Sequence, residues 1–138
     1  THHHPDHSFG ISKFIEIKAE IIMSQPETHM YLKYGNRLLR QVKNLIGDDW
    51  FIGTNIVKFE NSNQKFPLNL DLGGRKVSIE LFSQGHSEGD LLIKDMLSNT
   101  IFAGDLVFNE RAPTVPHANI NNWNLTHIQF VDTKPRNN

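Results

Sequence analysis

The first seven residues constrain this chain more than any other stretch. They read THHHPDH, in which His2, His4, Asp6 and His7 form the pattern His-x-His-x-Asp-His. In extended backbone, side chains two positions apart point the same way, so His2 and His4 can bind one cation from one side. Asp6 and His7 come after a bend and can face a second cation. Imidazole and carboxylate are ligands that suit Zn²⁺ and, less well, iron or manganese.

Three consecutive histidines near the start of a chain also occur in remnants of purification tags, which carry no information about the fold. Tags are homogeneous, whereas the histidines here continue into Pro5-Asp6-His7-Ser8-Phe9-Gly10, which is neither tag nor linker sequence. Further candidate metal ligands, His86 and Asp105, occur later in the sequence. A metal site is therefore the better interpretation.

Composition favours one soluble globular domain over residues 1–138, with 38% hydrophobic and 21% charged residues. The formal net charge of −1 gives no basic field that would attract nucleic acid or an anionic membrane. The chain has no cysteine, which excludes a disulfide framework, a thiolate nucleophile and a cysteine-containing metal site. No apolar run is long enough to span a bilayer. We therefore expect neither nucleic acid nor a membrane as a partner.

Hydrophobic spacing predicts helices in the first part of the chain and strands after it. The expected helices span residues 9–20 and 28–45, with a brief buried strand at 19–24 between them, closed by Pro26. Leu32, Leu38, Leu39, Val42 and Leu45 mark the apolar face of the longer helix. Alternation predicts strands at 55–60, 68–72, 76–81, 90–94 and 99–103, with turns at 61–63 and at Gly73-Gly74. One further helix is expected within 119–131, carrying Trp123, Leu125 and Ile128.

Two further ligand types stand where strands are expected to end. His86 lies in the glycine-flanked loop GHSEGD at 85–90, and Asp105 follows the apolar run IFA and Gly104. A lone loop histidine is more often a surface or core residue than a ligand, and a lone Gly-Asp after a strand is usually a turn. Combined with the first cluster, the three motifs are a specific signal for a metal site.

These residues resemble the metallo-β-lactamase-fold hydrolase superfamily through most of the chain. LDLGGR at 70–75, GHSEGD at 85–90 and FAGDLVF at 102–108, continuing to Pro113, are most similar to the zinc metallohydrolase of bacterial quinoprotein relay and sulfur-oxidation clusters. The resemblance implies the α/β class, with an αβ/βα sandwich and a site at the edge between its two sheets.

The same resemblance implies a dinuclear site that acts on a small-molecule substrate. His2, His4 and His86 would hold one metal, Asp6 and His7 the second, and Asp105 would bridge them. Two zinc ions are expected in the complete domain, and iron is possible. Zinc lowers the pKa of bound water to about 7, so hydroxide is available to attack an ester, lactone, thioester, amide or phosphoester. Asp6 would orient the nucleophile and shuttle its proton.

Several other polar residues are candidates for supporting roles, for surface positions or for a missing ligand. Asp90 and Glu88 are candidates to orient a ligand histidine, Asp90 being equally compatible with a plain strand-start residue. His3 is expected to face away from the metals, and His29 to lie on the surface near a helix start. The family's sixth site histidine lies in a Gly-His-Gly loop that this sequence does not contain. His117 or His127 could in principle replace it, although His127 is better read as a surface residue.

The family's strands before the first motif are also missing, so we interpret the chain as an internal, incomplete piece of the domain. Unpaired edge strands would then favour self-association into a homo-oligomer. Cysteine normally stands at the position of Asp105 in thiolate-ligand β-lactamases, so its absence argues against that group. Two alternatives remain: a mononuclear iron persulfide dioxygenase, and a non-catalytic metal-binding or interaction fragment. The compartment is open between cytoplasm and periplasm, and relay-type relatives are periplasmic.

Overall fold

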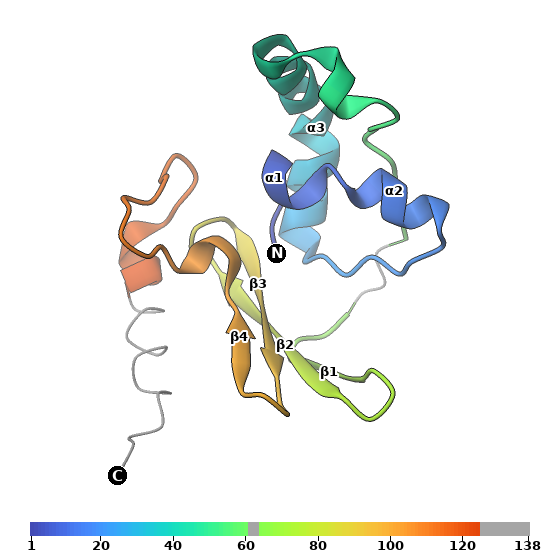
Figure 1. Cartoon of the computed structure of the whole chain (residues 1–138). Coiled ribbons are helices and arrows are strands. Elements are labelled where there is room, and N and C mark those ends of the chain that lie inside the picture. Colours follow the sequence, from blue (N-terminus) through green and yellow to red (C-terminus); the bar gives the residue numbers. More distant parts are fainter. Residues whose placement is uncertain (61–63, 125–138) are drawn as a thin grey trace. The chain divides into compact units, whose positions relative to one another are not determined.

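The computed structural model describes residues 1–60 and 64–124, and its contacts divide the chain into two compact units. His2 to Gln64 form the helical unit. Thr1 and the chain from Lys65 onward form the sheet unit. Figure 1 shows the helices of the first and the four strands of the second.

The helical unit contains α1 (Pro5–Ser8), α2 (Ile11–Glu16), α3 (Gln25–Ile46) and the 3₁₀ turn η1 (Asp48–Phe51). The short helix predicted within 9–20 is confirmed as α2. The long helix is also confirmed, but it begins at Gln25, three residues before the predicted start. Ser24 is its N-cap and Pro26 lies in its first turn. Proline is tolerated there because the first N–H groups of a helix have no partner within the helix.

The buried face of α3 differs from the predicted apolar face. Its buried residues recur every four positions, at Glu27, Tyr31, Gly35 and Leu39. Of the predicted face, Leu39 is buried, whereas Leu32 and Leu45 are 36% and 82% exposed. The helix thus buries a stripe that includes a carboxylate and a glycine, residue types that hydrophobic spacing does not count.

The strands predicted at 19–24 and 55–60 are wrong, because the structure has no strand in residues 2–60. Both segments instead pack their apolar side chains against the core around Tyr31, through Ile21, Met23, Ile56, Val57 and Phe59. The Tyr31 hydroxyl accepts a hydrogen bond from the Val57 N–H at 3.3 Å. Burial raises the pKa of Tyr31, so its hydroxyl stays protonated. Alternation therefore indicated which side chains are buried, but no second strand pairs with either segment.

The sheet unit is a four-stranded antiparallel sheet in the order β1-β2-β3-β4. The strands are β1 (Leu68–Asp71), β2 (Lys76–Ser83), β3 (Gly89–Asp95) and β4 (Thr100–Phe102), followed by the 3₁₀ turn η2 (Gly104–Leu106). All four predicted strands of this region are confirmed, as is the turn at Gly73-Gly74. Leu68 pairs with Ile79, and Ile79 with Ile93, so one face of the sheet is apolar.

An ion pair between Arg75 and Asp95 connects the turns at one end of this sheet. The Nε of Arg75 donates to Asp95 at 3.0 Å, and its Nη2 also donates to the same carboxylate oxygen. The Ser98 hydroxyl and the Leu97 N–H donate to Asp95 as well, at 2.6 and 3.0 Å. Asp95 therefore ties the turn before β2 to the turn after β3.

The core of the sheet unit lies against the middle of β3, where Leu92 is buried together with Leu106 and Trp123. Residues 120–124 are helical, which agrees with the start of the last predicted helix, while Leu125 and Ile128 lie outside the described residues. The Trp123 indole N–H donates to the Leu106 carbonyl at 2.9 Å. This bond anchors the helical residues beside η2.

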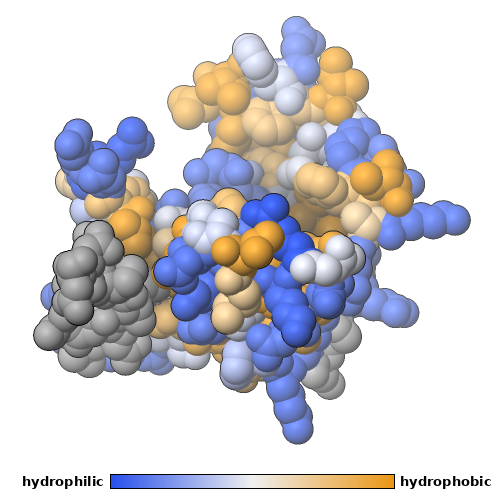
Figure 2. All heavy atoms as spheres, turned by 60° about the horizontal axis from the view of Figure 1, so that its bottom comes forward, coloured by the Kyte–Doolittle hydropathy of each residue, from blue (hydrophilic) through white to orange (hydrophobic). Residues whose placement is uncertain are grey.

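Large hydrophobic side chains also reach the surface, and in Figure 2 orange patches lie among blue ones. They include Leu45, Trp50 and Ile52 near the end of α3 and Leu72 and Leu97 in turns of the sheet. Among the described residues, no helix is both long enough and apolar enough to cross a membrane. The predicted self-association stays a prediction.

Candidate metal centre

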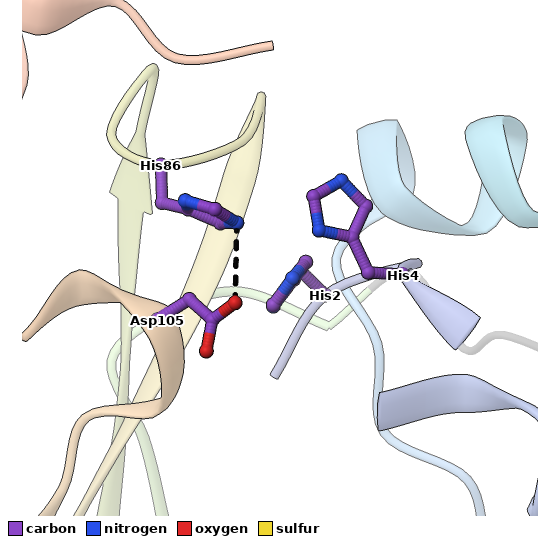
Figure 3. A group of neighbouring side chains, drawn as sticks. All are labelled: His2, His4, His86 and Asp105. Atoms are coloured by element: carbon purple, nitrogen blue, oxygen red, sulfur yellow. Dashed lines mark ion pairs between the residues drawn. The ribbon is translucent and has the colours of Figure 1, made fainter. Parts of the chain in front are cut away.

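The histidines of the first motif gather where the chain enters α1 of the helical unit. His4 is the N-cap of α1 and Pro5 begins the helix. The ring centroid of His2 lies 4.4 Å from that of His4 and 4.2 Å from that of His7. His2 and His4 each offer a ring nitrogen, and these nitrogens lie within 4.8 Å of each other. Figure 3 labels both rings. The predicted convergence of His2 and His4 is thus seen within this unit.

Asp6 and His7 form a second pair in the first turn of α1. The Asp6 Oδ2 lies 3.4 Å from the His7 Nε2, and the two side chains are 75% and 21% exposed. Asp6 is thus the most accessible of the acidic or imidazole side chains in the motif. A ligand that also exchanges protons with substrate or solvent needs this accessibility.

His3, which lies between His2 and His4 in the chain, is held by Glu27 of α3. Its N–H donates to Glu27 Oε2 at 2.8 Å, and its Nδ1 lies 2.6 Å from the same oxygen. The Ser8 hydroxyl donates to the carbonyl of His3 at 2.8 Å and to that of His4 at 3.0 Å. Sequence reasoning missed Glu27 and Ser8. The pattern Ser24-x-x-Glu27 indicates a helix start, but it carries no sign that Glu27 reaches a residue 24 positions earlier.

In the sheet unit, His86 lies in the loop between β2 and β3, as predicted. The ring is buried, with its centroid 5.3 Å from that of Trp123 and 6.0 Å from that of Phe108. These two aromatic side chains pack beside the imidazole. No local motif predicts this contact, because Trp123 lies 37 positions beyond His86 in the chain.

Asp90 braces the loop that carries His86. It is buried, and it accepts hydrogen bonds from the Ser87 N–H and the Ser87 hydroxyl, both at 2.8 Å. Its contacts therefore fix the residue that follows the histidine, which is more than a plain strand start requires. Glu88, the other predicted orienting residue, is exposed.

Asp105 lies in η2, directly after β4. The preceding Gly104 has a φ of +54°, and a Cβ there would come within 2.6 Å of the Thr1 hydroxyl oxygen, so both its conformation and its surroundings favour glycine. Asp105 Oδ2 lies 3.4 Å from His86 Nε2, the contact drawn as a dashed line in Figure 3. Two ligands about 2.1 Å from a tetrahedral metal lie about 3.4 Å apart. The donor atoms and their separation therefore fit a shared metal ion.

Two further histidines within the described residues are exposed. His117 is exposed and lines an open groove of about 510 Å³ together with Gln84, Glu88 and Asn121. His29 is exposed near the start of α3, as predicted. His127 lies outside the described residues.

Comparison with known proteins agrees with this architecture. The family model "Metallo-beta-lactamase superfamily" matches residues 1–129. The crystal structure of TTHA1623 in a di-iron-bound form superposes with a TM-score of 0.65 at 17% sequence identity. The alignment covers 98% of this chain but 63% of TTHA1623, so the chain spans less than two thirds of that protein's length. No curated protein matches significantly. The fold, the ligand motifs and the extent of the family match agree: the chain belongs to the metallo-beta-lactamase superfamily.

Proposed function

We propose that this protein is a metal-dependent hydrolase whose centre is built from His2, His4, Asp6, His7, His86 and Asp105. The observation that carries the proposal is the 3.4 Å separation of His86 Nε2 and Asp105 Oδ2. A histidine in one loop and a carboxylate after another strand meet at the spacing of two ligands on one ion. Membership of the superfamily supports including His2, His4, Asp6 and His7 of the first motif among the proposed ligands.

Within the sheet unit, Thr1 packs close to the segment that carries Asp105. The Thr1 carbonyl accepts a hydrogen bond from the Leu91 N–H at 3.0 Å, and Thr1 packs against Gly104, the neighbour of Asp105. The first motif follows Thr1 directly in the sequence.

A metal bound there supplies Lewis acidity and makes water nucleophilic at neutral pH. His86 and Asp105, held by the Trp123 contact and by η2, present donor atoms in a fixed direction. Asp6, with its exposed carboxylate, accepts the proton of the attacking water and returns it to the leaving group. The Ser87–Asp90 bonds keep the His86 loop from shifting during turnover.

The substrate class that we propose is an ester, lactone, thioester or amide. The carboxylate at position 105, in a chain without cysteine, separates the site from thiolate-ligand β-lactamases. The motifs at 70–75, 85–90 and 102–108 support the branch found in quinoprotein relay and sulfur-oxidation clusters. We propose zinc as the metal because imidazole and carboxylate donors suit it.

An iron-dependent redox enzyme is the second candidate, and one observation favours it. TTHA1623, which shares the fold, is described in a di-iron-bound form. Imidazole and carboxylate ligands also suit iron. Iron content and oxygen consumption with a persulfide would distinguish this candidate from the hydrolase.

The proposal is tested by loading the apoprotein with zinc or iron and assaying a lactone, a thioester and an aryl ester. We expect zinc-dependent hydrolysis of at least one class, abolished in His86→Ala. Glu88→Ala is the matched control, because Glu88 lies in the same loop with an exposed side chain. Activity in His86→Ala equal to the wild type would contradict the proposal. So would a metal-loaded wild type that hydrolyses none of the three.

A further inference from the structure

We infer that Glu27 is a positioning residue for the metal centre, acting on His2 and His4 through His3. The inference rests on the proposed function. Its basis is the pair of contacts from one carboxylate oxygen of Glu27 to the backbone N–H and to the ring of His3, at 2.8 and 2.6 Å. Glu27 itself is fully buried in α3.

The two contacts fix the conformation of His3. Because an ionised carboxylate only accepts hydrogen bonds, the His3 tautomer with its proton on Nδ1 is the one whose ring donates to Glu27. Both donors belong to one residue and converge on one oxygen, Oε2. They close a small ring that sets both side-chain torsions of His3 and directs its imidazole toward α3.

The backbone on either side of His3 is fixed at the same time. Glu27 holds the N–H of the peptide that joins His2 to His3. The Ser8 hydroxyl holds the carbonyl groups of His3 and His4. Three consecutive peptide planes are therefore restrained, and these planes set the directions in which His2 and His4 leave the chain. The ligands are directed before any metal arrives.

The position of Glu27 in its helix suits a side chain whose oxygen accepts both His3 hydrogen bonds. It is the third residue of α3, in the first turn. The partial positive charge of a helix N-terminus stabilises a carboxylate there. Buried charges are normally paired or hydrogen-bonded, and the His3 contacts meet that need.

The test compares the wild type with Glu27→Ala, Glu27→Gln and Tyr31→Phe. Zinc affinity is measured by competition with a chromophoric chelator, and ligand geometry by the absorption spectrum of bound Co²⁺. Glutamine keeps an oxygen that can accept both His3 bonds. Tyr31 lies one turn further along the same buried face and bonds Val57, so Tyr31→Phe perturbs α3 without touching the motif.

We expect Glu27→Ala to raise the zinc dissociation constant about 10- to 100-fold, the usual cost of losing a group that orients metal ligands. It should also alter the Co²⁺ spectrum. Glu27→Gln should restore most of the affinity and the wild-type spectrum. Tyr31→Phe should lower the melting temperature of the apoprotein and leave zinc affinity unchanged.

Wild-type affinity in Glu27→Ala would overturn the inference. So would an equal loss of affinity in Tyr31→Phe at a similar melting temperature, because the effect would then come from stability alone. A wild type that binds neither zinc nor cobalt would refute the proposed function instead. Hydrogen exchange of the His3 amide in the apoprotein then decides the inference separately. Faster exchange in Glu27→Ala supports the restraint, and unchanged exchange overturns it.

Discussion

Asp105 makes a clear prediction at the scale of single residues, because its carboxylate would serve both metals. Asp105→Ala should lower the metal content and abolish hydrolysis. The reason is that removing a bridging carboxylate takes one donor from each ion and leaves His86 without its neighbour at 3.4 Å. The measurement is metal content by elemental analysis, together with the hydrolysis rate under saturating zinc.

The control for Asp105 is His117→Ala. His117 is exposed in the groove beside Gln84 and Glu88, and we expect its loss to change little. Unchanged metal content and rate in Asp105→Ala would count heavily against a dinuclear site. A large loss in His117→Ala would mean that His117 takes the role of the family's sixth histidine.

Asp95 makes a prediction about pH. The Arg75 guanidinium, followed by the Ser98 hydroxyl, holds the pKa of Asp95 well below its ordinary value. Because the folded pKa is lowered, the stabilisation is present above the unfolded value of about 3.9 and is lost as the pH falls below it. Urea unfolding of the wild type and Asp95→Asn should differ by a constant amount from neutral pH to about pH 5, and by less below about pH 4.

A second variant checks the cause of that pH dependence. Arg75→Gln removes the group with the largest influence on Asp95 and should reduce the same pH-dependent part of the stability. A difference between the wild type and Asp95→Asn that stays constant down to strongly acidic pH would show that the ion pair does not affect folding.

At the scale of elements, α3 depends on a glycine in its interior. A Cβ at Gly35 would lie 2.9 Å from the Cδ1 and 3.0 Å from the Cγ1 of Ile56. Overpacking of this kind costs about 1–3 kcal/mol, and the better helix propensity of alanine returns about 1 kcal/mol. Gly35→Ala should therefore lower the free energy of unfolding by up to about 2 kcal/mol, as measured by urea unfolding.

Two variants separate crowding from helix propensity. Asn36→Ala, at the next and exposed position, should raise stability by about 0.5 kcal/mol because only propensity changes there. Ile56→Val should restore part of the loss in Gly35→Ala, since it removes the closest methyl group. An increase in stability for Gly35→Ala would mean that Ile56 moves aside at no cost.

The elements that the sequence predicts well are those whose signal is local. Strict alternation around Gly73-Gly74 indicated β1 and β2 because a hairpin pairs adjacent segments. The segments at 19–24 and 55–60 have a similar apolar content but form no strand. Whether a segment becomes a strand depends on a neighbour that pairs with it, and these two pack against a helix instead.

In the candidate site too, features with a local sequence signal could be predicted, and contacts between distant segments could not. Candidate ligands and their spacing can be read from the sequence, so His2, His4, Asp6, His7, His86 and Asp105 could be proposed as a set. The groups that hold them could not. Glu27 contacts His3 and Trp123 contacts His86 across 24 and 37 positions, and no local pattern indicates either contact.

At the scale of the whole molecule, the proposed ligands lie in both units, so metal binding should stabilise the entire chain. A ligand that binds only the folded state adds about 2.7 kcal/mol at a free concentration of about 100 times its dissociation constant. Zinc should therefore raise the melting temperature in calorimetry relative to the chelator-treated protein. Magnesium, which prefers oxygen ligands, should not. Equal melting temperatures with zinc and with chelator would argue against a shared site.

The most direct test of the account is the metal stoichiometry of the intact wild-type chain. The protein is loaded separately with zinc and iron, freed of excess metal, and measured by elemental analysis against protein concentration. We expect at least one ion of the preferred metal to stay bound per chain, and close to two only where the whole domain is present. A protein that retains neither metal would contradict the central claim that the histidine and aspartate motifs form a metal centre.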